Sequence, residues 1–158
     1  MTLVETGKDF RQENVLSLRK KMAHEDINLE MLMIDKFLKN SGARKTGPVV
    51  TTTYSIEAKD GQPLLDVEIL VPIDKKIELP SDYVLKPVFQ IKNAVYSRHK
   101  GNPSSLRITY SKMQEYIKKN QLQQITNGYN VQIKDLMPGM EPDEAIVDIY
   151  IGVNPNIL

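Results

Sequence analysis

The strongest constraint on the fold is that one series of elements, strand, helix, strand, strand, can be read twice along the chain. The first series covers about residues 14–73 and the second about residues 83–153. Each series ends on a similar strand, Asp-Val-Glu-Ile-Leu-Val from Asp66 and Asp-Ile-Tyr-Ile-Gly-Val from Asp148. Repetition of a whole supersecondary unit constrains a fold more than any single propensity does. The sequence therefore predicts an α+β domain built as a tandem βαββ repeat of two pseudo-symmetric halves.

Each half contains one segment with a single apolar stripe. The apolar residues recur at steps of four, three and four positions, as on one side of a helix: Ile27, Met31, Ile34 and Leu38 in the first half, and Leu106, Tyr110, Met113 and Ile117 in the second. Asp26 is the expected N-cap of the first helix, and Asn102, before Pro103, that of the second. Strands are expected at residues 14–22, 49–57, 64–71, 84–98, 130–134 and 145–153, with a hairpin turn at Asp60-Gly61.

Alternation along the last strand of each half separates two faces of the sheet. One face is apolar, with Val67 and Ile69 in the first half and Ile149 and Ile151 in the second. The two helices are expected to pack on this face, because their stripes need an apolar partner. The sequence thus predicts a mainly antiparallel, curved sheet with two helices on one face and an open cleft on the other.

The second face carries the candidate binding residues. Glu68 and Tyr150 occupy the same step of the two similar strands, and Tyr54 and Tyr96 are expected beside them. Such side chains on a sheet are often simply solvated. A carboxylate among aromatic rings, however, is suited to an organic cation, because each cation-to-ring contact contributes about 0.5 to 2 kcal/mol.

Composition narrows the classes of partner. The 158 residues suffice for one domain, expected at residues 14–158 after an N-terminal tail at residues 1–13. The 21 basic and 20 acidic side chains leave a formal charge of +1, so no DNA binding is expected. With no cysteine and only His24 and His99 as histidines, neither a metal site nor a cofactor is expected. The start of the chain is no signal peptide and no stretch could span a membrane, which favours a cytoplasmic protein.

Motifs for catalysis are also missing from the sequence. It contains no Gly-x-Ser-x-Gly nucleophile elbow, no Walker loop and no Gly-x-Gly-x-x-Gly loop. We therefore assign no catalytic residue and expect a protein that is not an enzyme.

Three motifs carry a resemblance to a known family. They are Gly47-Pro48, the strand from Asp66 to Pro72, and His99-Lys100-Gly101 ahead of a helix with Leu106, Tyr110 and Tyr116. Together they resemble the GyrI-like (gyrase inhibitor-like) effector-binding domain, over about residues 14–153. The resemblance implies a free-standing member of that family, with a cleft between its halves for hydrophobic, often cationic, small molecules.

The resemblance also implies a departure at two positions. The family often has an acidic residue, followed two positions later by tyrosine, on the strand that here contains Asn130 and Gln132. Asn130 would stand in place of the acid, and Gln132 in place of the tyrosine. Both are therefore candidate ligand-binding residues, and neither side chain carries a charge. A catalytic carboxylate, as hydrolytic members would need, is then missing.

Three functions remain open. The residues favour a non-catalytic binding module for a hydrophobic or cationic small molecule. The alternative is an interaction protein that keeps the fold without a working pocket and binds a protein partner or a second copy of itself. A hydrolase is the least favoured.

Overall fold

The computed structural model describes residues 3–134, 139, 141 and 144–157. The first two residues of the expected N-terminal tail lie outside this range. Among the described residues, no helix is both long and apolar enough to cross a membrane.

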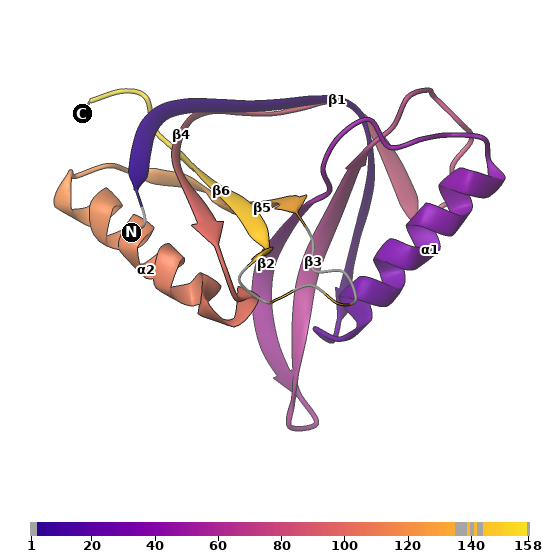
Figure 1. Cartoon of the computed structure of the whole chain (residues 1–158), viewed down its shortest axis with the longest axis horizontal. Coiled ribbons are helices and arrows are strands. Elements are labelled where there is room, and N and C mark those ends of the chain that lie inside the picture. The colour runs from indigo at the N-terminus through magenta and orange to yellow at the C-terminus, as the bar shows by residue number, and fades with distance from the viewer. Residues whose placement is uncertain (1–2, 135–138, 140, 142–143, 158) are drawn as a thin grey trace. The chain divides into compact units, whose positions relative to one another are not determined.

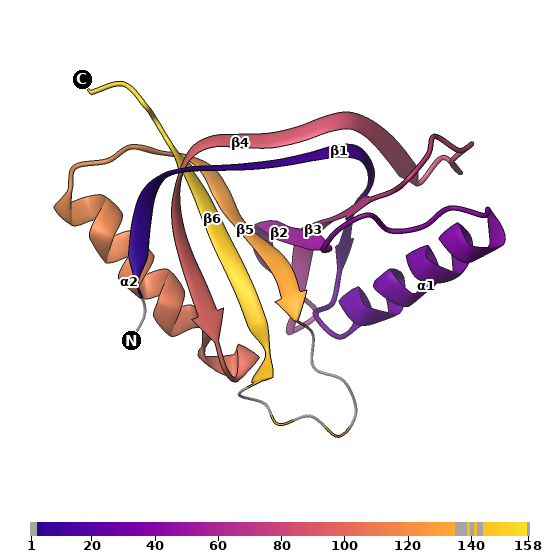
Figure 2. The same cartoon turned by 45° about the horizontal axis from the view of Figure 1, so that its top comes forward.

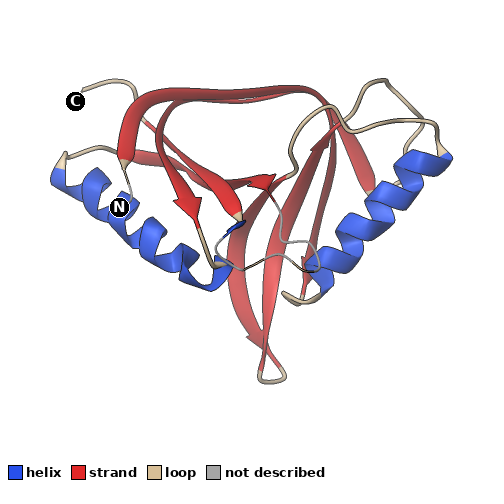
Figure 3. Cartoon of the chain, in the orientation of Figure 1, coloured by secondary structure: helices blue, strands red, loops and turns tan. Residues whose placement is uncertain are grey.

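The elements follow the predicted order (Figure 3). They are β1 (Val4–Met22), α1 (Asp26–Asn40), β2 (Val50–Lys59), β3 (Gln62–Pro72), β4 (Tyr83–Lys100), the short 3₁₀ helix η1 (Pro103–Ser105), α2 (Leu106–Lys119), β5 (Gln124–Lys134) and β6 (Ile146–Val153). β1 begins at Val4 rather than near residue 14, so much of the expected tail is strand. That the two series are structural duplicates stays a prediction.

The chain divides into two compact units. Unit 2 is residues 12–89, and unit 1 combines residues 1–11 with residues 90–158. Both boundaries fall inside a strand, since β1 and β4 each continue from one unit into the other. Unit 1 is therefore discontinuous in sequence.

The strand pairing overturns the expected sheet. The strands form a closed barrel in the order β1-β3-β2-β5-β6-β4. The pairs β1–β3, β2–β3, β4–β6 and β5–β6 are antiparallel. The prediction of an open, curved sheet with two helices on one face and an open cleft on the other is wrong. Within unit 2, the face expected to be open carries Glu68 and Leu70, and these are only 2% and 0% exposed. Alternation identifies which side chains share a face, but not whether the sheet closes on itself.

The core of unit 2 forms between α1 and the strands β1 and β3 (Figure 1). Val67 and Ile69 are buried in one cluster with Ile34 and Leu38 of α1, as the alternation predicts. The N-cap of α1 is Glu25, without a side-chain cap bond, so the prediction of Asp26 as N-cap is wrong.

The β2–β3 hairpin is built on its predicted turn. Asp60 and Gly61 have φ angles of 52° and 76°, the left-handed conformation that a two-residue hairpin loop of this type requires. The turn sets the pairing of β2 with β3 from Lys59 and Gln62 back to Ser55 and Asp66, where the register shifts.

The core of unit 1 forms between α2 and the strands beside it (Figure 2). Ile149 and Ile151 are buried with Met113 and Ile117 of α2, which confirms the predicted packing. Asn102 also acts as the predicted cap, because its side chain accepts a hydrogen bond of 3.0 Å from the backbone N–H of Ser104.

Candidate functional site

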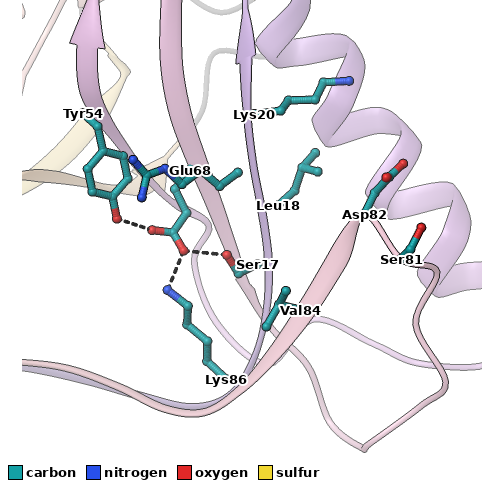
Figure 4. A pocket seen from close by; sticks show the side chains of 10 residues that line it. Ser17, Leu18, Lys20, Tyr54, Glu68, Ser81, Asp82, Val84 and Lys86 are labelled. Carbon is teal, nitrogen blue, oxygen red and sulfur yellow. Dashed lines mark hydrogen bonds and ion pairs between the residues drawn. The ribbon is translucent and has the colours of Figure 1, made fainter.

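A pocket of about 720 Å³ lies within unit 2. Its lining comes from β1, β2, β3, the start of β4 and the residues just before it (Figure 4). The lining residues are Ser17, Leu18, Arg19, Lys20, Tyr54, Glu68, Ser81, Asp82, Val84 and Lys86. Pockets of roughly 300 to 1,000 Å³ are typical of small-molecule sites.

Glu68 is the most buried carboxylate of this pocket. It lies on β3, opposite Arg19 of β1 and Thr52 of β2, so neighbouring strands flank it on both sides. The register of these strands follows from the buried apolar residues on the helix-facing side, since a one-residue shift would expose them. The fold thus places a carboxylate where the side chain is almost wholly removed from water.

Three donors satisfy the Glu68 carboxylate (Figure 4). The Ser17 hydroxyl donates to Oε2 at 2.5 Å, and the Lys86 ammonium donates to the same oxygen at 2.5 Å. The Tyr54 hydroxyl donates to Oε1 at 2.6 Å. A buried carboxylate needs such partners to stay ionised.

The pKa of Glu68 reflects two opposing effects. Burial raises the pKa, because the charged form loses its hydration. The hydrogen bonds from Lys86, Ser17 and Tyr54, with the positive charge of Lys86, together outweigh burial and bring the pKa below its ordinary value. Glu68 is therefore negatively charged at neutral pH.

Tyr54 is positioned by an irregularity in β2. The register with β3 shifts between Thr53 and Ser55, and such a bulge redirects the side chain at that point. The guanidinium of Arg19 lies over the Tyr54 ring, 3.6 Å from its centre, and also makes two hydrogen bonds to the Asp66 carboxylate. The ring therefore already has a cation on its face, in an arrangement that an organic cation also favours.

Tyr96 and Tyr150 lie in unit 1, in a cluster of their own. Their ring centres are 5.0 Å apart, and the ring of Phe10 is 5.0 Å from that of Tyr150. The Tyr96 hydroxyl donates to Asp148 at 2.9 Å, and Arg98 makes two hydrogen bonds to the same carboxylate. Burial, and then the bond to Asp148, raise the pKa of Tyr96 to about 12. The joint role of these tyrosines with Glu68 stays a prediction.

Asn130 and Gln132 occupy the helix-facing side of β5. They lie opposite Ile149 and Val147 of β6, and residues opposite each other in a sheet share a face. Tyr110 of α2 donates a hydrogen bond of 2.5 Å to the Asn130 side chain. Tyr150 pairs instead with Tyr129, on the opposite face of the sheet. The structure therefore does not place Asn130 and Gln132 on one face with Tyr150.

The sequence did not single out Ser17, Lys86 or Arg19. Ser17 and Arg19 lie on alternate positions of β1, so their shared face was readable from the sequence, but their partner on β3 was not. Lys86 lies in the part of β4 that belongs to unit 2. Nothing in its local pattern indicates a partner on β3. Within the described ranges, no three His, Asp or Glu side chains gather closely enough to hold a metal ion.

Comparison with known proteins rests on structure. No protein-family model matches the sequence, and no curated protein matches it. The solved C-terminal domain of EcmrR gives a TM-score of 0.78 at 19% identity, over 98% of this chain and 97% of that domain. The chain has the fold of that domain. The agreement supports the GyrI-like fold that the sequence resembles.

Other solved structures share the fold. EcmrR in its complex with DNA gives a TM-score of 0.79 at 18% identity, and the match covers 96% of this chain but only 57% of that one. A hydrolase from Listeria innocua gives a TM-score of 0.61 at 16% identity, over 94% of this chain and 92% of that one. At these identities the likeness is one of fold alone, because one fold serves many chemistries.

Proposed function

We propose that the chain is a non-catalytic binding module whose ligand is a small organic cation with an apolar body, held in the pocket around Glu68. One observation carries the proposal. A carboxylate that stays charged lines the pocket while its side chain is 3% exposed. Attraction of a cation is stronger there than at an exposed carboxylate, because less water screens the two charges.

The other lining groups suit the apolar part of such a ligand. Tyr54 lines the pocket with an aromatic ring, although its hydroxyl donates to Glu68 and Arg19 lies over one face of the ring. Val84 lines the same pocket with 57% of its surface exposed, so a ligand could cover apolar area that now contacts water. The fold likeness to the EcmrR C-terminal domain is consistent with a binding role but does not identify a ligand.

The first prediction concerns Glu68. Benzyltrimethylammonium is titrated by calorimetry into the wild type and into Glu68→Gln, with the uncharged aromatic N-benzylacetamide as a parallel probe. Loss of the carboxylate should weaken binding of the cation at least about 10-fold, since the cation is attracted by the charge. The affinity for the neutral compound should change by less than about 3-fold.

Asp82→Asn is the matched control, because Asp82 lines the same pocket but is exposed. It should change the cation affinity by less than about 3-fold, as screened charges contribute little. Equal affinity of the wild type and Glu68→Gln for the cation would show that Glu68 does not contribute to the binding site. Tyr150→Ala, measured in the same series, tests the prediction that Tyr150 contributes.

A further inference from the structure

A cation of this chain already occupies the Glu68 carboxylate. The Lys86 ammonium lies 2.5 Å from Oε2, and its side chain is 37% exposed where that of Glu68 is 3% exposed. The charged end of Lys86 reaches the buried oxygen while part of its side chain remains in contact with water. Of the pocket's other cationic groups, Arg19 pairs with Asp66 and Lys20 pairs with Glu30 of α1.

We propose that Lys86 is a tethered competitor that any cationic ligand must displace from Glu68. It lowers the affinity for every cation by the same factor, so that only cations whose apolar body adds further contacts bind appreciably. This inference rests on the proposed function of the Glu68 pocket. It assigns Lys86 a role in setting the affinity for cations in general rather than in ligand contact.

Competition by a tethered group is strong because the group never diffuses away. A side chain held beside its partner acts at an effective concentration in the millimolar range or above. A free alkylammonium offers Glu68 the same charge as Lys86 and no more, so it gains little by replacing it. A cation with an aromatic or bulky apolar body also covers Tyr54 and Val84 and can therefore displace the lysine.

The size of the effect follows from how often Lys86 occupies the carboxylate. If Glu68 is free of Lys86 for about 1 to 10% of the time, the apparent dissociation constant of every cation is raised about 10- to 100-fold. Because the displaced group is the same for each ligand, the factor is also the same. Removing the Lys86 ammonium should therefore raise the affinity for all cations by one common factor.

The variant Lys86→Met tests this, since methionine keeps an unbranched side chain and lacks the charge. Lys45→Met is the matched control, because Lys45 is also a partly exposed, paired lysine of unit 2, bonded to Asp35 at 3.2 Å, but does not line this pocket. Benzyltrimethylammonium and n-butylammonium are titrated into the wild type and both variants. Lys86→Met should bind both probes about 10- to 100-fold more tightly, by a similar factor, and Lys45→Met should bind them as the wild type does.

A second measurement uses the wild-type chain, in case Lys86→Met folds poorly. Lysine labelled at Nζ with nitrogen-15 reports the Lys86 ammonium by NMR. Saturating benzyltrimethylammonium should move the Lys86 signal towards that of a solvated lysine and leave the signal of Lys45, outside the pocket, in place. A bound cation that leaves the Lys86 signal unchanged would overturn the competitor role.

The outcomes separate the two proposals. If the wild type binds benzyltrimethylammonium through Glu68 but Lys86→Met binds it equally or less tightly, the competitor role is wrong and the binding function stands. A gain for one probe alone also overturns the competitor role, because displacement of one group must favour both. If neither the wild type nor Lys86→Met binds either cation, the binding function and the competitor role both fail.

Discussion

Glu68 shows how a carboxylate can be buried and still carry a charge. Its hydration is replaced by one ammonium and two hydroxyl donors, drawn from β1, β2 and β4. Each donor makes a charge-assisted hydrogen bond, which is stronger than one between neutral groups. The folded chain therefore favours the ionised form of Glu68 more than the unfolded chain does.

The lowered pKa of Glu68 predicts a specific dependence of stability on pH. A group whose pKa is lower in the folded state adds stability above its unfolded pKa, and the gain is lost as pH falls through the folded pKa. At pH 7, Glu68→Gln should lower the free energy of unfolding by about 1 to 3 kcal/mol. The difference from wild type should shrink below the ordinary pKa of 4.5.

Urea unfolding of the wild type and Glu68→Gln between pH 3 and about pH 7 measures this difference. Asp82→Asn removes an exposed carboxylate of the same pocket and serves as the control. A difference between wild type and Glu68→Gln that stays constant down to pH 3 would contradict the lowered pKa.

The sequence identified Glu68 and one of the three donors around its carboxylate. Alternation on β3 separated Glu68 from the apolar Val67 and Ile69, and Tyr54 was named beside it. The donors Ser17 and Lys86 could not be named, because they lie 51 and 18 positions away in sequence. Only the pairing of β1 with β3, and the placement of the start of β4, bring them to the carboxylate.

At the scale of elements, α2 packs closely on β5 because residue 128 is glycine. A Cβ atom at this position would overlap the ring of Tyr110, whose hydroxyl is hydrogen-bonded to Asn130. Burial raises the pKa of the Tyr110 hydroxyl, as expected for a phenol enclosed between a helix and a strand. Gly128 therefore allows the tyrosine to lie against the strand backbone.

Gly128→Ala should lower the free energy of unfolding by about 1 to 3 kcal/mol, since the methyl group overpacks a filled contact. The loss of free energy of unfolding should be smaller when Gly128→Ala is made in a Tyr110→Leu background, because the clashing ring is absent. Urea unfolding of the wild type, the two single variants and the double variant gives the coupling energy between positions 110 and 128. Additive effects would show that the glycine is needed for another reason.

The elements themselves were largely predictable. The stripe from Ile27 to Leu38 gave α1, and Asp60-Gly61 gave the β2–β3 turn, because these signals are local. The barrel was not predictable, since its closure depends on pairs of strands distant in sequence. The hint available in the sequence was that Leu70, on the face assumed to be open, is apolar, and the structure buries this side chain.

At the scale of the whole molecule, unit 1 needs the beginning of the chain to complete its structure. The Ser97 hydroxyl donates a hydrogen bond of 2.9 Å to the backbone oxygen of Leu3. Val4 packs on the buried cluster of α2 and β6, and Phe10 contacts the ring of Tyr150. These contacts join segments that are more than ninety positions apart.

Deleting residues 1–11 should therefore destabilise unit 1 selectively. The free energy of unfolding should fall by about 2 to 4 kcal/mol, through lost apolar burial and hydrogen bonding. Native-state hydrogen exchange should show reduced protection in β6 and the second part of β4, with a smaller effect in β3. Unchanged protection in β6 would show that the first segment contributes little to unit 1.

The discontinuity of unit 1 has a consequence for synthesis on the ribosome. Residues 12–89 leave the ribosome as one continuous stretch, so unit 2 has its own strands and helix before the rest is translated. The segment containing Val4 and Phe10 is translated before unit 2, yet its partners on β4 and β6 are made after it. This segment must therefore remain without its final contacts until β6 has been released from the ribosome.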